Sequence, residues 1–346
     1  MAKDNKRKRS DTNGTTSSGP DTSKPTAVFT PSGPRSTTLT VALPGSIIAN
    51  AKSHDQKTYL AGTLARAFAV FCVDEVVVFD DQPASASSRS RRGNDNEGYT
   101  ALSDPSHFLI HLLSFLETPP HLRKTLFPMH DNLRTAGTLP SLDMPHHLRS
   151  NEWCPYREGV TTTKSKAGTN VDVGLGDDYL LPGVEIPAKT RVTVRLPEDD
   201  SVEAEAVAPS TPREVDGFYW GYTIRRATSL SAVFTECPFD GGYDISFGTS
   251  ERGRSVSSLT PSDVPEYQHL LLLFGGVAGL ETAARNDTDL KERGITGANV
   301  SELFDFWVNL VPGQGSRTIR TEEAVWCGLM GLKGIVDERR ASEADV

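Results

Sequence analysis

The chain has 346 residues and a formal net charge of −9, and 37% of its residues are hydrophobic and 23% charged. This length exceeds that of a usual single domain, and the composition is typical of a soluble globular protein. The acidic total argues against a protein that coats nucleic acid non-specifically, although a local basic groove remains compatible with it.

Several classes of protein are disfavoured by simple patterns. The longest nearly apolar run, 270–280, has about half of the roughly 20 residues that a membrane span needs. The basic N-terminus lacks the apolar core of a secretory signal. The four cysteines are scattered without CxxC spacing, which is typical of a reducing compartment. We therefore expect neither a membrane partner nor a disulfide framework.

The first part of the chain predicts a polar tail followed by a β-α-β unit. Residues 1–36 are rich in Ser, Thr, Pro and Lys, so we expect them to be disordered. The KRKR cluster at 6–9 fits a nuclear localisation signal and an ordinary solvated tail equally well. An alternating strand is predicted at 38–44, followed by helical periodicity in DQKTYLAGTLARAFAVF and a buried parallel strand in EVVVFDD.

The following segments predict a loop, two helices and a change of architecture. Residues 82–104 are polar and predict a mobile loop, and Pro119 with Pro120 divides the next helical stretch into two. Short alternating segments between 151 and 230, such as TRVTVRL, SVEAEAVA and GFYWGYTIRRA, predict a small β-barrel. The α/β pattern then returns with strands in YDISFG, LLLLF and LFDFWVNLV and a last helix from Thr321. We therefore predict one α/β domain, 37–150 and 231–346, interrupted by a barrel at 151–230.

Three glycine-containing segments each follow a predicted strand: GTSERG at 248–253, GGVAGLE at 275–281 and PGQGSRTIRTEE at 312–323. In an open parallel sheet, ligands bind beyond the carboxyl ends of the strands, where glycine lets the backbone approach closely. One such segment would be an ordinary turn, but three predict a shared site.

The ligand of this site is not expected to be a nucleotide phosphate. The chain contains no GxxxxGK[ST], and neither GGVAGLE nor PGQGSR completes a dinucleotide fingerprint. Glu322 and Glu323 fall in the first turn of the last helix, with Thr321 as its expected N-cap, and these carboxylates would repel a phosphate. We therefore expect an uncharged or cationic ligand.

These three segments, together with VALPGSIIANAK and YLAGTLARAFAVFCVDEVVVFDD, resemble the SPOUT superfamily of α/β-knot RNA methyltransferases. More narrowly, they resemble the archaeal and eukaryotic subgroup that carries an OB-type barrel inserted in the knot domain. The resemblance covers residues 37–335. It implies a parallel sheet flanked by helices whose last part is threaded into a trefoil knot, an exception to the rule against knotted chains.

The resemblance also implies that the knot loops hold S-adenosylmethionine in a bent conformation, with S-adenosylhomocysteine as product. Its sulfonium agrees with the acidic first turn. The implied cofactor-binding residues are Gly248, Thr249, Ser250, Gly275, Gly276, Gly279, Leu280, Glu281, Val311, Pro312, Gly313, Gln314, Gly315, Ser316, Thr318 and Ile319.

The implied chemistry is an in-line methyl transfer, to which a protein contributes positioning and removal of a proton. The catalytic candidates are Arg66, Glu251 and Arg252. Arg66 takes the place of an arginine in the first motif of ribose-methylating members, but the neighbouring Asn-x-Gly pattern is missing. An equally good interpretation of Arg66 is a helix arginine that pairs with Asp74 or Glu75. Glu251 and Glu281 are both candidates for the proton acceptor.

RNA contacts are expected from the barrel and from the end of GTSERG, because OB folds bind single strands through aromatic stacking and basic side chains. The candidates are Tyr219, Tyr222, Arg225 and Arg254, although strand alternation leaves a core role open for those in the barrel. The pair His107 and His111, and the group His146, His147 and Cys154, lack a complete ligand set, so we expect no metal site.

The leading hypothesis is a nuclear or nucleolar methyltransferase of ribosomal RNA that works as a homodimer through its knot domain, with a cytoplasmic location left open. Within the subgroup, uridine N3 is the favoured acceptor. The rival is a catalytically inactive RNA-binding scaffold that retains the knot and the barrel. A nucleotide-dependent dehydrogenase is a third idea, disfavoured by the missing fingerprint.

Overall fold

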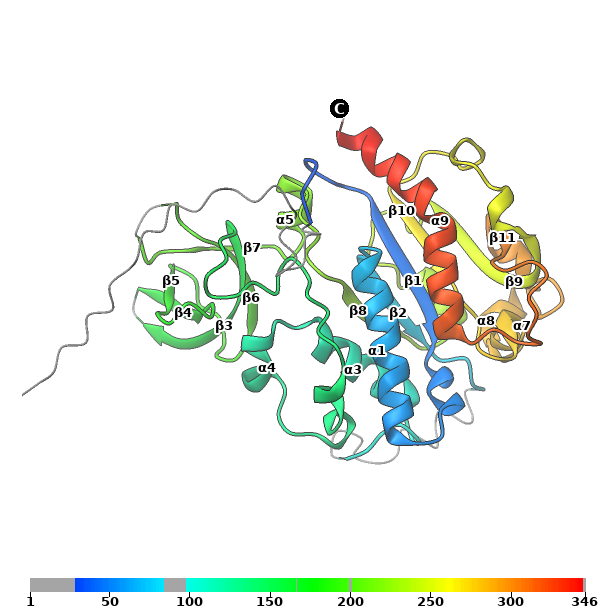
Figure 1. Cartoon of the computed structure of the whole chain (residues 1–346), viewed down its shortest axis with the longest axis horizontal. Helices are drawn as coiled ribbons and strands as arrows, with labels where there is room; N and C mark the ends of the chain where they lie inside the picture. The colour runs from blue at the N-terminus through cyan, green and yellow to red at the C-terminus, as the bar shows by residue number, and fades with distance from the viewer. Residues whose placement is uncertain (1–28, 84–97, 166, 199–200, 345–346) are drawn as a thin grey trace, which may run out of the picture.

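The protein is described by a computed structural model that covers residues 29–83, 98–165, 167–198 and 201–344. Two sheets make up the fold, and the antiparallel one lies to one side of the parallel one (Figure 1). The KRKR cluster and the centre of the predicted 82–104 loop lie outside the described residues.

The larger sheet has six strands, and every neighbouring pair is parallel. Strand β1 lies inside it, where Val41 pairs with Val76 on one side and Leu272 on the other. The spatial order is β11 (Phe306–Asn309), β9 (Ile245–Ser255), β10 (His269–Leu273), β1 (Thr38–Pro44), β2 (Glu75–Phe79) and β8 (Thr223–Ala227).

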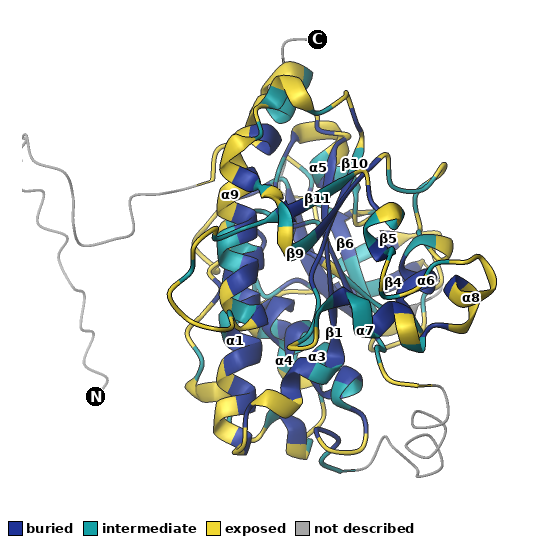
Figure 2. Cartoon of the chain, turned by 90° about the vertical axis from the view of Figure 1, so that its right-hand side faces the viewer, coloured by how far each residue is buried: buried dark blue, intermediate teal, exposed yellow. Residues whose placement is uncertain are grey.

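Both faces of this sheet are buried, as expected for parallel strands (Figure 2). Along β1, the side chains of Leu39, Val41 and Leu43 belong to one hydrophobic core, whereas Ala42 belongs to the core on the opposite face. The first core is covered by α1 (His54–Val70), α3 (Pro105–Glu117) and α9 (Thr321–Ala344), and the second by α6 (Leu230–Thr235), α7 (Gly279–Asn286) and α8 (Thr288–Glu292).

Local sequence signals explain where the first helices begin and end. Ser53 and Gln56 form a reciprocal capping box at the start of α1. Asp104 accepts a hydrogen bond from the backbone N–H of His107 at 3.0 Å and so caps α3. Two prolines follow α3, and α4 (Pro120–Leu126) starts at the second of them. The predicted strand at 38–44, the helix after it and the division into α3 and α4 are therefore confirmed.

The central part of the chain forms an antiparallel sheet in the order β5 (Tyr179–Pro182), β4 (Gly168–Asp172), β3 (Tyr156–Ser165), β6 (Arg191–Arg195) and β7 (Glu205–Val207). Leu180 exchanges backbone hydrogen bonds with Val202 and Ala204, at 2.8 and 2.9 Å, which nearly closes this sheet into a barrel. The expected α/β class with a small barrel-like sheet is confirmed at this level.

Two details of the sequence interpretation are wrong. The TIRRA part of GFYWGYTIRRA, assigned above to the barrel, is β8 of the parallel sheet and pairs with β2. The stretch 29–36, assigned to the tail, is described by the structure, and Arg35 forms a two-pronged ion pair with the buried Asp74 at 2.8 and 3.0 Å. Both errors concern pairings between distant segments, which local patterns do not report.

An ion network links α3 to the antiparallel sheet. Glu117 at the end of α3 pairs with Arg191 of β6 at 2.6 Å, and Arg191 also pairs with Glu158 of β3 at 2.5 Å. The Trp220 indole N–H donates to Glu158 at 2.7 Å. Burial alone raises the pKa of Glu117, but Arg191 and His146 outweigh it and hold this pKa well below its usual range.

Candidate functional site

The three glycine-containing segments meet where β10 and β11 end, beside the later part of β9. GGVAGLE follows β10 and leads into α7, and PGQGSRTIRTEE follows β11 and leads into α9. GTSERG is not a separate loop, because it lies within β9. There the pairing jumps from Trp307 opposite Gly248 to Val308 opposite Arg254, so residues 249–253 bulge out of the sheet.

Hydrogen bonds tie the segments together. The Thr321 hydroxyl donates to the Gly275 carbonyl at 3.0 Å, which joins the segment after β11 to the one after β10. The Thr249 hydroxyl donates to the Leu273 carbonyl at 3.1 Å. The Asn309 amide donates to the Glu251 carbonyl at 2.8 Å. The predicted convergence of the three segments is therefore present in the structure.

Thr321 is not the N-cap that the sequence indicates. It is the first residue of α9, and its hydroxyl is used by Gly275. Glu323 instead accepts a hydrogen bond from the Arg320 backbone N–H at 2.9 Å and satisfies a donor at the start of this helix. A carboxylate therefore occupies the helix N-terminus, as expected for a site that does not take a phosphate.

Close backbone approach explains two of the glycines. A Cβ on Gly275 would lie 2.6 Å from the Gly279 backbone, and a Cβ on Gly253 would lie 2.4 Å from the Val308 backbone. A side chain at either position would force these segments apart. By contrast, a Cβ on Gly315 would meet nothing within 4 Å, so the segment after β11 borders open space.

The residues at this edge fit S-adenosylmethionine. Val277 offers an exposed apolar side chain, and Gly313, with a φ of 72°, and Gly315 present backbone beside open space. The carboxylate of Glu281 suits a sulfonium, and the guanidinium of Arg252, 3.8 Å from Glu281, suits the carboxylate of the cofactor. The cofactor would supply an electrophilic methyl group on sulfur.

The catalytic candidates take different places. Glu251 and Arg252 lie on the bulge, and their side chains are 73% and 72% exposed. Arg66 on α1 donates to the carbonyls of Ser141 and Leu142 at 3.0 and 2.9 Å, and neither belongs to the three segments.

The alternative reading of Arg66, a pairing with Asp74 or Glu75, is wrong. Asp74 pairs with Arg35 and Arg340, whereas Glu75 pairs with Arg225.

The aromatic residues expected to bind RNA are buried. Tyr219 is 1% exposed and Tyr222 is 4% exposed, and both rings lie in the core beside α1 and α3. Their hydroxyls donate to backbone carbonyls of Val73 and Leu113, at 3.1 and 3.2 Å. Arg225 pairs with Glu75 at 3.1 Å on β2. The two tyrosines therefore stabilise the junction before β8 by packing in the core beside α1 and α3, and Arg225 links β8 to β2.

Arg254 keeps an accessible side chain. It lies at the end of the bulge, its side chain is 54% exposed, and it donates to the Ser258 carbonyl at 2.8 Å. An interaction with Asp263 at 3.8 Å is weak at this exposure. Of the four residues proposed for RNA, Arg254 is the one with a charge available at the surface beside the three segments.

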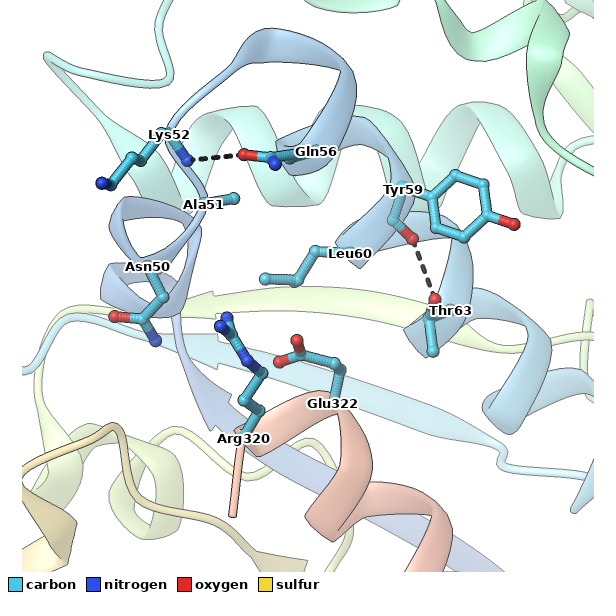
Figure 3. A pocket seen from close by; sticks show the side chains of 9 residues that line it. All are labelled: Asn50, Ala51, Lys52, Gln56, Tyr59, Leu60, Thr63, Arg320 and Glu322. Atoms are coloured by element: carbon cyan, nitrogen blue, oxygen red, sulfur yellow. Dashed lines mark hydrogen bonds between the residues drawn. The ribbon is translucent and has the colours of Figure 1, made fainter. Parts of the chain in front are cut away.

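A pocket of about 580 Å³ lies between the end of η1 (Gly45–Asn50), α1 and the start of α9 (Figure 3). Glu322 approaches it from the first turn of α9 and Arg320 from the residue just before that helix. The remaining lining comes from Asn50, Ala51, Lys52, Gln56, Tyr59, Leu60 and Thr63. Atom Oε2 of Glu322 is buried and has no hydrogen-bond partner within the described part of the chain. The sequence interpretation missed this pocket, because nothing local indicates that α1 and α9 lie together.

Asp81 was also missed, although it ends the run EVVVFDD at the carboxyl end of β2. Its Oδ2 atom accepts a hydrogen bond from the Ser46 hydroxyl at 2.7 Å. Burial is the main cause that raises the pKa of Asp81, and the neighbouring Asp80 adds to it. Two consecutive carboxylates after a buried strand were the available signal.

The histidines lie apart from this site. His107 and His111 are neighbours on α3, and burial lowers the pKa of His111 to about 4. His146 and His147 both contact the Glu117 carbonyl. Among the residues that the structure describes, no group of three or more His, Cys, Asp or Glu side chains is arranged to hold a metal ion. No helix within the same ranges is long and apolar enough to cross a membrane.

Comparison with known proteins gives consistent matches over most of the chain. A family model described as "Putative RNA methyltransferase" matches residues 38–332. The 28S rRNA (uridine-N(3))-methyltransferase of Homo sapiens is 44% identical over 311 residues, which are 86% of this chain and 78% of that protein. The protein of the same name from Mus musculus is 45% identical over 86% of this chain and 76% of its own length. The protein of Caenorhabditis elegans named "Putative methyltransferase spot-1" is 31% identical over 83% of this chain and 78% of its own length.

Proposed function

Because the chain belongs to the RNA methyltransferase family whose model spans residues 38–332, we propose that it methylates N3 of a uridine in ribosomal RNA. S-adenosylmethionine is the proposed methyl donor. The human and mouse relatives, named for this reaction on 28S rRNA, cover most of the chain and support this choice of RNA and of acceptor atom.

The observation that carries the proposal is the meeting of three segments: the bulge within β9, the segment after β10 and the segment after β11. The hydrogen bond between Thr321 and Gly275 joins the last two. Glycine backbone, one exposed apolar side chain and carboxylates in place of phosphate ligands suit a sulfonium cofactor. In this proposal, residues 275–281 and 311–319 hold its adenosine, while Arg252 binds its carboxylate.

The proposal includes the SPOUT trefoil knot. Strand β11 forms one edge of the sheet, yet the helix that follows it returns to α1, where the Trp326 indole donates to the Thr63 carbonyl at 3.3 Å. A last segment that passes from the sheet edge back to its centre supports threading of the chain end. The barrel-like sheet of β3 to β7, at 156–207, then forms an insertion within this domain, and Arg254 contacts RNA phosphate beside the cofactor.

A homodimer through α1 and α9 completes the proposal. These helices expose apolar side chains, including Tyr59 and Met330, the latter 64% exposed. A second copy would bury them and bring its own residues towards the pocket of Figure 3. A nuclear, nucleolar location follows from a ribosomal RNA substrate and is part of the same proposal.

The test combines cofactor titration with analysis of the product. Calorimetry measures binding of S-adenosylmethionine to the protein and to Gly315→Arg, and mass spectrometry detects 3-methyluridine in ribosomal RNA treated with each. We expect saturable binding and methylation by the wild type only. Gly137→Arg is the matched control, because its Cβ also meets open space but it lies before the barrel, outside the three segments.

The rival function predicts a different pattern. An RNA-binding scaffold without turnover would bind ribosomal RNA and leave uridine unmethylated. In that case the wild-type protein and Gly315→Arg would support cell growth equally well. Growth that requires both cofactor binding and methylation excludes the scaffold, whereas wild-type protein that binds no cofactor at millimolar concentration overturns the proposed enzyme.

A further inference from the structure

Methylation at uridine N3 requires a proton acceptor, because N3 carries a hydrogen that must leave as the new bond forms. Two carboxylates near the glycine segments are poorly suited to this task. Glu281 lies 3.8 Å from the Arg252 guanidinium, and Glu251 is largely exposed and 3.7 Å from the same guanidinium. The Arg252 guanidinium therefore already faces both carboxylates.

Asp81 is a carboxylate of another kind. Its Oδ2 atom is fixed by the Ser46 hydroxyl at 2.7 Å, and its backbone carbonyl is fixed by the Asn286 amide at 2.8 Å. Its Oδ1 atom is buried and has no hydrogen-bond partner among the described residues. An oxygen of this kind is costly to maintain unless a donor is supplied by something that binds.

The position of Asp81 is next to the proposed cofactor segment. A Cβ built on Gly276 would lie 3.5 Å from Asp81 Oδ2 and 3.5 Å from Ser46 Oγ. The ends of β1, β2 and β10 therefore meet here, with the carboxylate facing backbone that lacks a side chain. Glycine at 276 leaves room between the two segments.

The charges around Asp81 are already engaged with one another. Arg226 of β8 pairs with Asp80 at 3.1 Å and with Asp104 at 2.6 Å. Ser46 from η1 and Asn286 from α7 are uncharged, and Asp80 carries the same charge as Asp81. Burial is the largest cause and raises the pKa of Asp81, and Asp80 acts in the same direction. Hydrogen bonds from the Ser46 hydroxyl, the backbone N–H of Asp81 and the Gln82 side chain oppose it without cancelling it. Asp81 is thus a stronger base than an ordinary aspartate.

We propose that Asp81 is the catalytic base that takes the N3 proton of the target uridine, an inference that rests on the proposed function. The N3–H proton moves to Oδ1, and the electron pair left on N3 forms the N–C bond to the methyl carbon. The S–C bond breaks and its electrons stay on sulfur, which becomes a neutral thioether. The proton passes from Asp81 to water after the product leaves.

Asp81→Asn is the central variant, because asparagine has the same shape but accepts no proton. We expect its affinity for S-adenosylmethionine, measured by calorimetry without RNA, to stay within about twofold of wild type. Its single-turnover rate of uridine methylation falls by at least about 100-fold. Its rate also rises continuously with pH, since only uridine that is already ionised reacts, whereas the wild-type rate levels off once Asp81 is ionised.

Glu322→Gln is the matched comparison. Within the described residues, Oε2 of Glu322 is the one other carboxylate oxygen that is buried without a hydrogen-bond partner. We expect it to keep the wild-type shape of the pH profile. Ser46→Ala removes the donor to Oδ2, so it shifts the acid limb of the profile to higher pH. A carboxyl-carbon NMR titration of the cofactor-free protein measures the pKa of Asp81 directly. We expect this pKa to lie above that of an ordinary aspartate, and to be higher still in Ser46→Ala.

Each remaining outcome overturns the proposal in a recognisable way. An Asp81→Asn enzyme with a wild-type rate and pH profile shows that Asp81 is not the base, while the proposed function stands. If the methylation rate of Glu322→Gln instead rises continuously with pH, the base is Glu322, in the pocket beside α9. Wild-type protein that binds cofactor but does not methylate uridine N3 overturns both the proposed function and the role of Asp81.

Discussion

The Thr321 hydroxyl donates a 3.0 Å hydrogen bond to the Gly275 carbonyl, so the first residue of α9 holds the segment that follows β10. Thr321 is buried, and valine has nearly the same shape without the donor. We expect Thr321→Val to lower the free energy of unfolding by about 1 kcal/mol and to weaken cofactor binding, because the Gly275 carbonyl loses its partner. Urea unfolding and calorimetry measure the two effects.

Thr321→Ser is the control for this prediction, since serine keeps the hydroxyl. Cofactor affinity close to wild type in Thr321→Ser and reduced in Thr321→Val assigns the effect to the hydrogen bond. Equal affinity in all three proteins would show that this bond does not position the segment.

The burial of Tyr222 leads to a prediction that separates stability from RNA binding. Its hydroxyl donates to the Leu113 carbonyl at 3.2 Å inside the core. Tyr222→Phe should lower the free energy of unfolding by about 1 kcal/mol. Tyr222→Ala should lower it by roughly 3–5 kcal/mol, because a cavity replaces the ring. Binding of a fluorescent ribosomal RNA fragment should be unchanged in Tyr222→Phe, and a clear loss of affinity there would return this ring to the RNA surface.

The ion network at Glu117 predicts how stability depends on pH. Burial raises the pKa of Glu117, but Arg191 and His146 more than offset it, and the folded-state pKa is lowered from 4.5. A lowered folded-state pKa means that the stabilisation is complete above the unfolded value and is lost as the pH falls towards the folded one. We therefore expect the free energy of unfolding to fall as the pH decreases below about 4.5.

Glu117→Gln isolates this contribution. Glutamine cannot pair with Arg191 as an ion, so the variant is less stable near neutral pH, and its stability changes less with pH in the acid range. Urea unfolding at several pH values measures both properties. Curves for the two proteins that remain parallel through the acid range would show that Glu117 is not responsible for the acid sensitivity.

The exposed face of α9 predicts the assembly state. Met330 is among the most exposed apolar side chains of this helix, and a charge there opposes burial in an interface between two copies. Met330→Glu should convert the dimer to a monomer in light scattering at micromolar concentration, with its circular dichroism unchanged. Met129→Glu is the matched control, because Met129 is fully exposed on the segment after α4. A wild-type monomer would contradict this part of the proposal.

The sequence by itself determined the elements whose signals are local. The alternation of β1, the apolar runs of β2 and β10, the capping residues of α1 and the paired prolines after α3 each act within a few neighbouring residues. The same holds for the glycine-containing segments after β10 and β11, since glycine after a buried strand is visible without knowing the partner strand. The expectation of an uncharged or cationic ligand also rests on local charge, at Glu322 and Glu323.

Only the tertiary structure decided which segments become neighbours. The sequence of β8 predicts a barrel strand, but β8 pairs with β2 of the parallel sheet. This pairing buries Tyr222, just before β8, and places Arg225 beside Glu75. Asp81 and Gly276 come together because β1 lies between β2 and β10 in the sheet. Parallel pairing joins residues far apart in the chain, so the local sequence pattern does not show which residues come into contact. It also does not show which side chains become buried, and burial decides how basic and how accessible a side chain is.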